Sequence, residues 1–245
     1  MKDKNIIQIH RSYKALSLYE KVSVERWQRF NPEYTYYFLN HDEADQHVYD
    51  LFPEWKEHYE SLPLGSQSNI RRAAILFNIG GIYVDCDLCP VVPLSEYIPE
   101  KSEVVLFSHP IRNMYMNACF ASDKGQELMK QLAFEGLRRT FDLEQPSDQK
   151  SDDWLSWHFH TTGVLCCQDV FGASPYRLED AISGLHYHHH DVADGNAPSD
   201  MKAMHFGTGL WMPRRSAVKP QDMYNEQNIN LNALHEMFGP TGRKL

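Results

Sequence analysis

The stretch SNIRRAAILFNIGGIYVDCD, residues 68–87, decides the fold because it predicts a helix, a glycine turn and a strand in immediate succession. In its first half, apolar residues recur at helical spacing, at Ile70, Ala73, Ala74 and Phe77. Residues 66–68 (Ser-Gln-Ser) offer candidate caps for the first turn, and Gly80-Gly81 is typical of a helix end. We expect residues 82–87 to form the next strand, with Pro90 and Pro93 ending it.

Outward from this stretch, strand-like and helix-like segments alternate, which predicts an α/β fold with a mostly parallel sheet. The expected strands cover residues 5–10, 34–39, 104–108 and 201–206, and the expected helices cover 18–30, 42–49, 53–60 and 124–138. Residues 180–200, which include the histidine-rich run 186–190, are predicted to form a loop. We expect one domain over residues 1–245, with a polar tail from about residue 214.

The amino-acid composition and net charge exclude several classes of protein. The chain has 245 residues, of which 42% are hydrophobic, so it can bury a substantial core. Its formal net charge of -9 argues against a nucleic-acid partner, which would need a basic surface. The five cysteines are an odd number and are expected to be reduced and mostly buried. Since no apolar stretch suggests a signal peptide or a membrane span, we predict a cytoplasmic protein.

Two aspartates at the end of the predicted strand carry the chemistry. Side chains alternate along a strand, so Tyr83, Asp85 and Asp87 should share one face. Two carboxylates that point the same way repel each other unless a cation lies between them, and oxygen ligands suit Mg²⁺ or Mn²⁺. Such ions usually share their coordination with substrate phosphates. The pair therefore predicts a nucleoside-diphosphate site, although roughly one such pair is expected by chance in a chain of this length.

The helix before the aspartates adds two polar residues. Asn69 and Arg72 lie three residues apart and hence on one face of the helix. If the helix start points toward the end of the strand, Arg72 can reach a phosphate or a sugar, since its fork of donors suits oxygen-rich ligands. The alternative is a surface arginine, and of the two neighbours Arg71 is the one expected at the surface.

The run from Ser68 through Asp87 resembles the signature of the glycosyltransferases with a sugar-binding region and a D-x-D motif. These form glycosyltransferase family 32, which includes yeast initiating α-mannosyltransferases and bacterial capsule and surface-glycan enzymes. The run is also similar to the catalytic core of the clostridial glucosylating toxins. Shorter likenesses occur at residues 7–10, 26–34, 117–118, 162–163 and 204–211, so the resemblance spans most of the chain.

The resemblance implies a GT-A fold, a divalent cation (Mn²⁺ or Mg²⁺), a nucleotide-sugar donor such as a UDP- or GDP-hexose, and transfer with retention to a hydroxyl acceptor such as one on a surface glycan. It implies that Asp87 binds the metal directly and that Asp85 contacts the donor ribose and the metal. It also implies that Arg72 binds the donor and that Tyr83 lies beside it. Asn69 takes a place linked to the donor sugar.

Three further assignments follow from the same resemblance. Gln8, on the opening strand, falls where the family binds its donor. His205 falls where several retaining GT-A enzymes have a metal ligand; without the resemblance it would be interpreted as a core histidine between Met204 and Phe206. Trp211 falls on the mobile segment that covers the diphosphate.

The sequence departs from the family at two places and leaves two other functions open. The family usually has Asp where this chain has Asn69, and Ser where it has Leu210. Asn keeps hydrogen-bonding reach but loses the charge, so donor preference or activity should differ. A catalytically weak sugar-nucleotide binder is therefore one alternative. The other is a metal-dependent phosphoesterase that uses Asp85, Asp87 and the histidines of residues 186–190.

Overall fold

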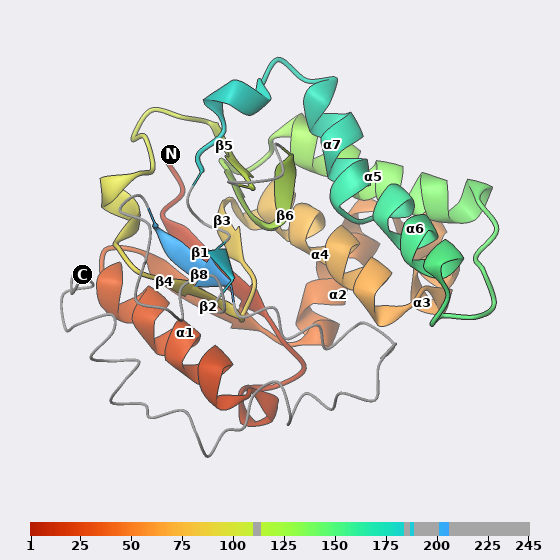
Figure 1. Ribbon diagram of the computed structural model, residues 1–245, viewed down its shortest axis with the longest axis horizontal. Helices are drawn as coiled ribbons and strands as arrows, with labels where there is room; N and C mark the ends of the chain where they lie inside the picture. The colour runs from red at the N-terminus through yellow and green to blue at the C-terminus, as the bar shows by residue number, and fades with distance from the viewer. Residues whose placement is uncertain (110–113, 184–186, 189–200, 206–245) are drawn as a thin grey trace.

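A computed structural model describes residues 1–109, 114–183, 187–188 and 201–205 of the chain (Figure 1). The first half contains strands β1 (Asn5–Ile9), β2 (Thr35–Leu39), β3 (Gly81–Val84) and β4 (Leu88–Pro90) and helices α1 (Leu18–Phe30), α2 (His41–Leu51), α3 (Lys56–Ser61) and α4 (Leu64–Ile79). The second half contains strands β5 (Val104–Ser108), β6 (Tyr115–Ser122), β7 (Tyr187–His188) and β8 (Ala203–His205) and helices α5 (Glu127–Asp142), α6 (Asp152–Thr161) and α7 (Val164–Gly172). Short 3-10 turns lie at Tyr13–Ala15, Pro53–Trp55, Leu94–Glu96 and Leu178–Asp180.

A five-stranded sheet with the order β2-β1-β3-β6-β5 forms the centre of the fold. β1 pairs in parallel with both β2 and β3, whereas β6 is antiparallel to both β3 and β5. It follows that four of the five strands run in one direction and β6 runs against them. The predicted mostly parallel α/β sheet is confirmed. A second sheet, with the order β4-β8-β7, adjoins the end of β3 in sequence.

Successive residues of the central strands bury opposite faces of the sheet. Ile7 and Tyr83 belong to a core cluster that includes residues of α2, α4, α5 and α7, whereas Ile6 and Ile82 belong to a cluster that includes Trp27 of α1. Figure 1 accordingly shows α1 on one side of the sheet and α2 to α7 on the other. The strands read as near-continuous apolar runs because both of their faces are covered.

Helix α1 begins with a capping box and binds the backbone of β4. Ser17 accepts a hydrogen bond from the Glu20 amide, and the Glu20 side chain accepts one from the Ser17 amide, so a capping box starts the helix. Further along, Ser23 Oγ and Trp27 Nε1 each donate to the Leu88 carbonyl at 2.7 Å. The helix thereby ties β4, which follows Asp87 directly, to the rest of the fold.

Helix α4 begins earlier than predicted. Its first residue is Leu64, after Pro63, so Ser66 and Ser68 lie inside the helix and do not cap it. Proline is compatible with a helix start because the first amides have no partner within the helix. The predicted end is confirmed, since Gly80 follows the helix with φ 75° and Gly81 opens β3 with φ 116°.

Four other predictions need correction. The strand predicted over residues 82–87 ends at Val84, and the helix predicted over 124–138 covers Glu127–Asp142. The predicted loop 180–200 contains the strand β7, because Tyr187–His188 pairs in parallel with β8. The chain between residues 115 and 172 also forms β6, α6 and α7, which the sequence did not indicate. The opening strand, α1 and β5 lie where they were predicted.

Other sequence-based expectations concern single residues and the ends of the chain. All five cysteines are free and buried, as predicted. Among the residues that the structure describes, every helix is too short or too polar to cross a bilayer. The polar tail expected from about residue 214 lies outside the described residues.

Gly81 gives a test of the turn that leads into β3. A Cβ there would lie 2.5 Å from the Asn5 carbonyl oxygen, and φ 116° is unfavourable for a residue with a side chain. We expect Gly81→Ala to lower the free energy of unfolding by about 2 kcal/mol or more. The control is Gly125→Ala, where φ is 78° but nothing lies within 4 Å of the added Cβ. It should cost about 1 kcal/mol. Urea unfolding of both variants checks the difference, and equal losses would contradict the close-contact argument.

Candidate functional site

Asp85 and Asp87 lie in a turn rather than on a strand. After Val84 the Asp85 amide still donates to the Ala118 carbonyl of β6, at 2.9 Å, but the chain then turns and the Leu88 amide donates back to the Asp85 carbonyl at 3.0 Å. Aspartate is common in such turns. The turn changes the predicted geometry, because the two carboxylates approach each other through backbone reversal and not through strand alternation.

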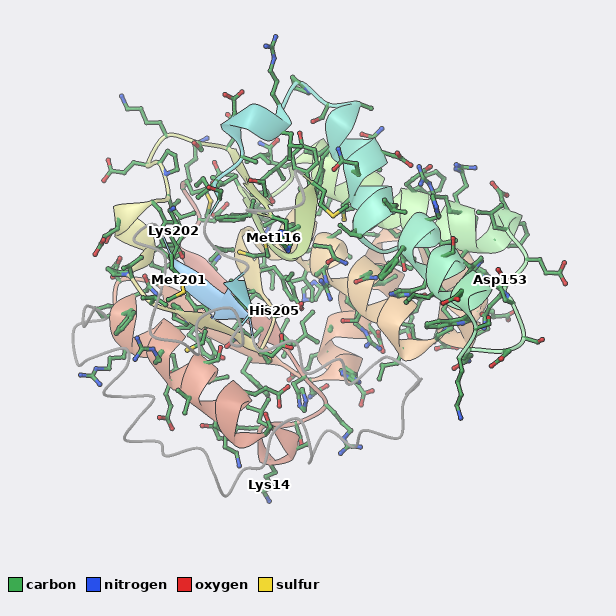
Figure 2. The ribbon with its side chains drawn as sticks, in the orientation of Figure 1. Lys14, Met116, Asp153, Met201, Lys202 and His205 are labelled. Carbon is green, nitrogen blue, oxygen red and sulfur yellow. The ribbon has the colours of Figure 1, made fainter. Side chains whose placement is uncertain are left out.

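His205 joins the two aspartates from a distant part of the sequence. β8 pairs antiparallel with β4, and this register sets His205 opposite Leu88, one residue beyond Asp87. His205, which is labelled in Figure 2, places its Nε2 3.2 Å from Asp87 Oδ1. Ligand-type atoms of Asp85, Asp87 and His205 all lie within 4.8 Å of one another. These three residues, which we call the carboxylate–histidine group, are the ones for which a metal role was predicted.

The electrostatics of this group suit a cation. Burial raises the pKa of Asp85 above its usual value, and the neighbouring Asp87 charge adds to the rise, although the Arg72 guanidinium opposes it. Burial lowers the pKa of His205, but the Asp87 and Asp85 carboxylates together outweigh burial, so the net pKa is raised. The two carboxylates thus draw a proton or another positive charge toward them. Two carboxylates and an imidazole are ligands that Mn²⁺ accepts, which fits a divalent ion.

Arg72 reaches the group from α4. Its Nη2 lies 3.3 Å from Asp85 Oδ1, and its guanidinium lies over the Tyr83 ring, 4.9 Å from the centroid. Nη1 donates to the Asn117 carbonyl, and the Tyr83 hydroxyl donates to Asp85 Oδ1 at 2.5 Å. Arg72 is therefore held rigidly by its neighbours, with its charge directed at the aspartate turn.

Gln8 supports the same turn from β1. Its Nε2 donates to the Asp85 carbonyl at 3.2 Å, while its Oε1 accepts from the Tyr36 hydroxyl at 2.6 Å. Gln8 is fully buried. In the structure this residue holds the backbone of the turn, and the predicted contact with a donor remains a prediction.

Asn69 lies one helical turn before Arg72, in a buried polar cluster. Asn117 Nδ2 donates to Asn69 Oδ1 at 3.3 Å, and Asn69 Nδ2 donates to Thr162 Oγ1 at 3.3 Å. His158 of α6 lies on the same side of Asn69, with its Nε2 3.4 Å from Asn69 Nδ2. The sequence suggested residues 117 and 162 as family landmarks but did not indicate that they meet at Asn69.

The prediction for Arg71 is wrong. This residue is buried, and its Nε and Nη2 bind the Asp45 carboxylate of α2 at 2.5 and 3.0 Å. The register of α4 explains the difference: Arg71 points toward α2, whereas Arg72 points toward β3. Helical spacing alone did not predict that α2 would cover this side of α4.

Two predicted elements of the site are partly or wholly outside the described residues. Trp211, assigned to a covering segment, is outside them. Of the histidine run 186–190, the structure describes the backbone of residues 187 and 188, in β7. His188 is in register with His205 of β8, so this described part of the run lies beside the strand that carries the third residue of the carboxylate–histidine group.

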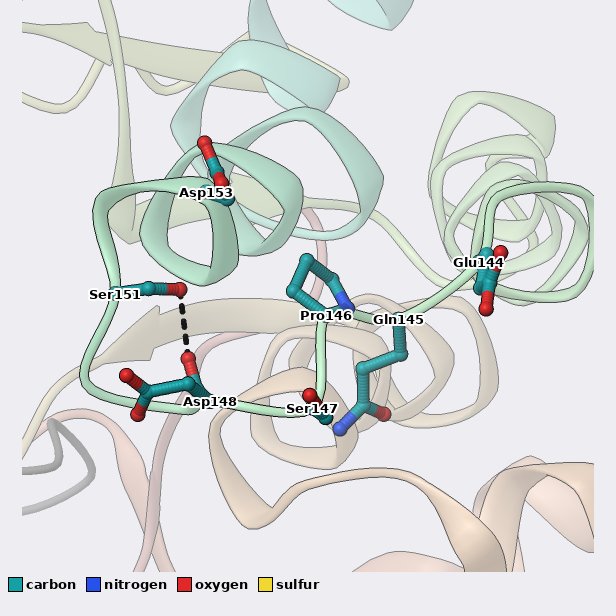
Figure 3. A pocket seen from close by; sticks show the side chains of 7 residues that line it. All are labelled: Glu144, Gln145, Pro146, Ser147, Asp148, Ser151 and Asp153. Carbon is teal, nitrogen blue, oxygen red and sulfur yellow. Dashed lines mark hydrogen bonds between the residues drawn. The ribbon is translucent and has the colours of Figure 1, made fainter.

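A separate acidic hollow lies in the connection between α5 and α6 (Figure 3). It has a volume of about 470 Å³ and is lined by Glu144, Gln145, Pro146, Ser147, Asp148, Ser151 and Asp153. Ser151 Oγ donates to the Asp148 carbonyl at 2.7 Å across one side. The lining contains no member of the carboxylate–histidine group, so the hollow is a different surface of the molecule.

Comparison with known proteins links the site to one family. Residues 17–104 match the family described as "Glycosyltransferase sugar-binding region containing DXD motif". A protein of Saccharomyces cerevisiae that carries a glycosyltransferase name, HOC1, is 37% identical over 79 residues. This match covers 31% of the present chain and 20% of the yeast protein, so the chain corresponds to a small part of that relative. Both Asp85 and Asp87 lie inside the segment matched by the family.

One solved structure supports the fold, and a second is more weakly similar. The PaToxG glycosyltransferase aligns with a TM-score of 0.51 at 16% identity, over 69% of this chain and 68% of that one. A glycosyltransferase involved in the glycosylation of the major capsid of PBCV-1 aligns over 82% of this chain and 92% of its own, with a TM-score of 0.41 at 13% identity. The first of these likenesses shows that the chain has a glycosyltransferase fold, as the GT-A prediction required.

The carboxylate–histidine group predicts where a metal ion binds. Asp87→Asn preserves the shape of the side chain but removes one charge, so the affinity for Mn²⁺ should fall about 100-fold or more. Asp148→Asn in the acidic hollow is the matched control and should leave the affinity unchanged. Titration of each variant with Mn²⁺, followed by calorimetry, checks both results. Loss of binding in Asp148→Asn but not in Asp87→Asn would assign the ion to the hollow instead.

Proposed function

We propose that this chain, whose residues 17–104 match the DXD-containing sugar-binding region of the glycosyltransferases, transfers a hexose in a metal-dependent reaction from a nucleoside-diphosphate donor to an acceptor hydroxyl. The observation that supports this most strongly is the meeting of Asp85, Asp87 and His205 beside Arg72. Two carboxylates and an imidazole are suited to a divalent ion, and the arginine is suited to phosphate oxygens. A nucleoside diphosphate requires both.

In the proposed reaction the bond between the anomeric carbon and the diphosphate oxygen breaks, and its electron pair leaves with the diphosphate. The acceptor oxygen forms the new bond to the same carbon, and its proton passes to the departing diphosphate oxygen. Asp85, Asp87 and His205 hold the divalent ion, which when bound supplies positive charge beside the departing diphosphate. Arg72 adds a second, fixed positive charge at the same place. By the family resemblance, the new bond forms with retention of configuration.

Around these groups, other residues keep the geometry in place before the donor arrives. Tyr83 donates to Asp85, which fixes one carboxylate oxygen, and Gln8 holds the backbone carbonyl of the same residue. Arg72 is confined by the Asn117 carbonyl and the Tyr83 ring. Electrostatic stabilisation is strongest when donors and charges need not reorganise during the reaction. Trp211 completes the proposal as the residue that covers the diphosphate.

Arg72 has a neighbour that serves as its matched control. In Arg72→Lys the charge stays but the planar fork is lost, so kcat/KM for the donor should fall about 10- to 100-fold. Arg71→Lys makes the same change one residue away, where the fork binds Asp45 instead. It should lower stability while leaving kcat/KM within about threefold of the wild-type value. Steady-state kinetics and thermal unfolding of both variants test the assignment, which fails if Arg71→Lys costs more activity.

The two alternative functions predict different products. We expect release of nucleoside diphosphate from at least one of a panel of UDP- and GDP-hexoses with Mn²⁺, increased by a hydroxyl acceptor. Hydrolysis of a simple phosphodiester, with no sugar released from any donor, would instead support a phosphoesterase. Donor-dependent thermal stabilisation without turnover would support a sugar-nucleotide binder. For an active donor, the anomeric configuration of the product, measured by NMR, tests retention.

A further inference from the structure

His158 lies in the interior of the protein, beside Asn69, the residue that the family resemblance links to the donor sugar. Its ring is almost completely buried and stacks on Trp154 with an interplanar angle of 3° and 5.3 Å between centroids. Nδ1 lies 3.1 Å from Ser66 Oγ, and Nε2 lies 3.4 Å from Asn69 Nδ2. Both ring nitrogens therefore face polar atoms of α4.

The protonation of this ring is constrained by its surroundings. Burial lowers the pKa of His158 to about 4, and the neighbouring Arg72 charge acts in the same direction. A neutral imidazole has one donor nitrogen and one acceptor nitrogen. Because the Asn69 amide NH₂ can only donate, Nε2 accepts from it, and the ring proton lies on Nδ1, where it is donated to Ser66 Oγ.

This arrangement also orients the Asn69 side chain. With its NH₂ directed at His158 and Thr162, Asn69 presents its Oδ1 to Asn117 Nδ2. An amide oxygen can accept two hydrogen bonds, so one acceptor position of Oδ1 remains for a further donor such as a sugar hydroxyl. A carboxylate at position 69 has no proton for Nε2, so an aspartate would draw the ring proton from Nδ1 to Nε2, and the ring would then lose its donation to Ser66 Oγ or have to become charged.

We propose that His158 is a positioning residue. Its ring favours an amide side chain at position 69, and it holds the Asn69 carbonyl oxygen in place to accept a hydroxyl of the donor sugar. The part that concerns the sugar rests on the proposed function; the pairing of the two side chains does not. On this basis, Asn69, which departs from the family pattern, forms a hydrogen-bonded pair with the neutral His158 of α6.

The hydrogen bond between His158 and Asn69 can be tested without measuring enzymatic turnover. Long-range ¹H–¹⁵N NMR of the ¹⁵N-labelled protein at neutral pH should show His158 as the Nδ1–H tautomer, with the signal assigned by its loss in His158→Gln. In Asn69→Asp the proton should appear on Nε2, either in the other tautomer or in the charged ring. Observation of an Nε2–H or a charged His158 in the wild-type protein would overturn the proposal, whether or not the protein is an active enzyme.

The effect on the donor is measured by a double-mutant cycle. The amide of Gln can present either its oxygen or its NH₂ to residue 69, so His158→Gln should tolerate both Asn and Asp there. Asn69→Asp should therefore lower kcat/KM for the donor more in the His158 protein than in His158→Gln, by about threefold or more. Equal losses in the two backgrounds, with the expected tautomer present, would confine His158 to a structural role. A wild-type protein that turns over no donor would count against the proposed function, while the NMR result still decides the pairing.

Discussion

The structure is organised around two carboxylates that share a partly buried turn. Asp85 and Asp87 cannot both be charged there at low cost without positive charge beside them. Arg72 approaches from α4 and His205 from β8, segments more than 130 residues apart in sequence, and both place nitrogen atoms within about 3.3 Å of a carboxylate oxygen. In the proposed function, a divalent ion satisfies the same requirement more fully and adds the positive charge that a diphosphate needs.

Around this turn the backbone is held from several directions. β6 accepts the Asp85 amide, Gln8 of β1 donates to the Asp85 carbonyl, and α1 binds the Leu88 carbonyl through Ser23 and Trp27. The small sheet β4-β8-β7 then brings His205 into register. The turn thus lies where the large sheet, the small sheet and α1 meet, and its shape depends on all three.

The predicted helix–turn–strand unit shows which features of the structure local sequence patterns can predict. The apolar spacing of α4 and the glycines at its end were sufficient to identify the helix and the strand after it, because both signals depend on neighbouring residues. The same reasoning placed Asp85 and Asp87 on the strand and Arg71 at the surface, and both statements were wrong. The end of β3 depends on β4 and β8, and the burial of Arg71 depends on Asp45 of α2.

By itself, the sequence determined the α/β fold class, the helix–turn–strand unit of residues 68–87 and the two aspartates that could hold a cation, since these follow from periodicity, glycine positions and side-chain chemistry. The metal role of His205 was indicated only by the family resemblance. Only the tertiary structure decided which of these residues meet. The register of β8 sets His205 beside Asp87, and the packing of α6 on α4 sets His158 and Thr162 against Asn69. Such contacts join residues that are 89 or more positions apart in sequence, and no local pattern specifies the pairing or packing that brings them together.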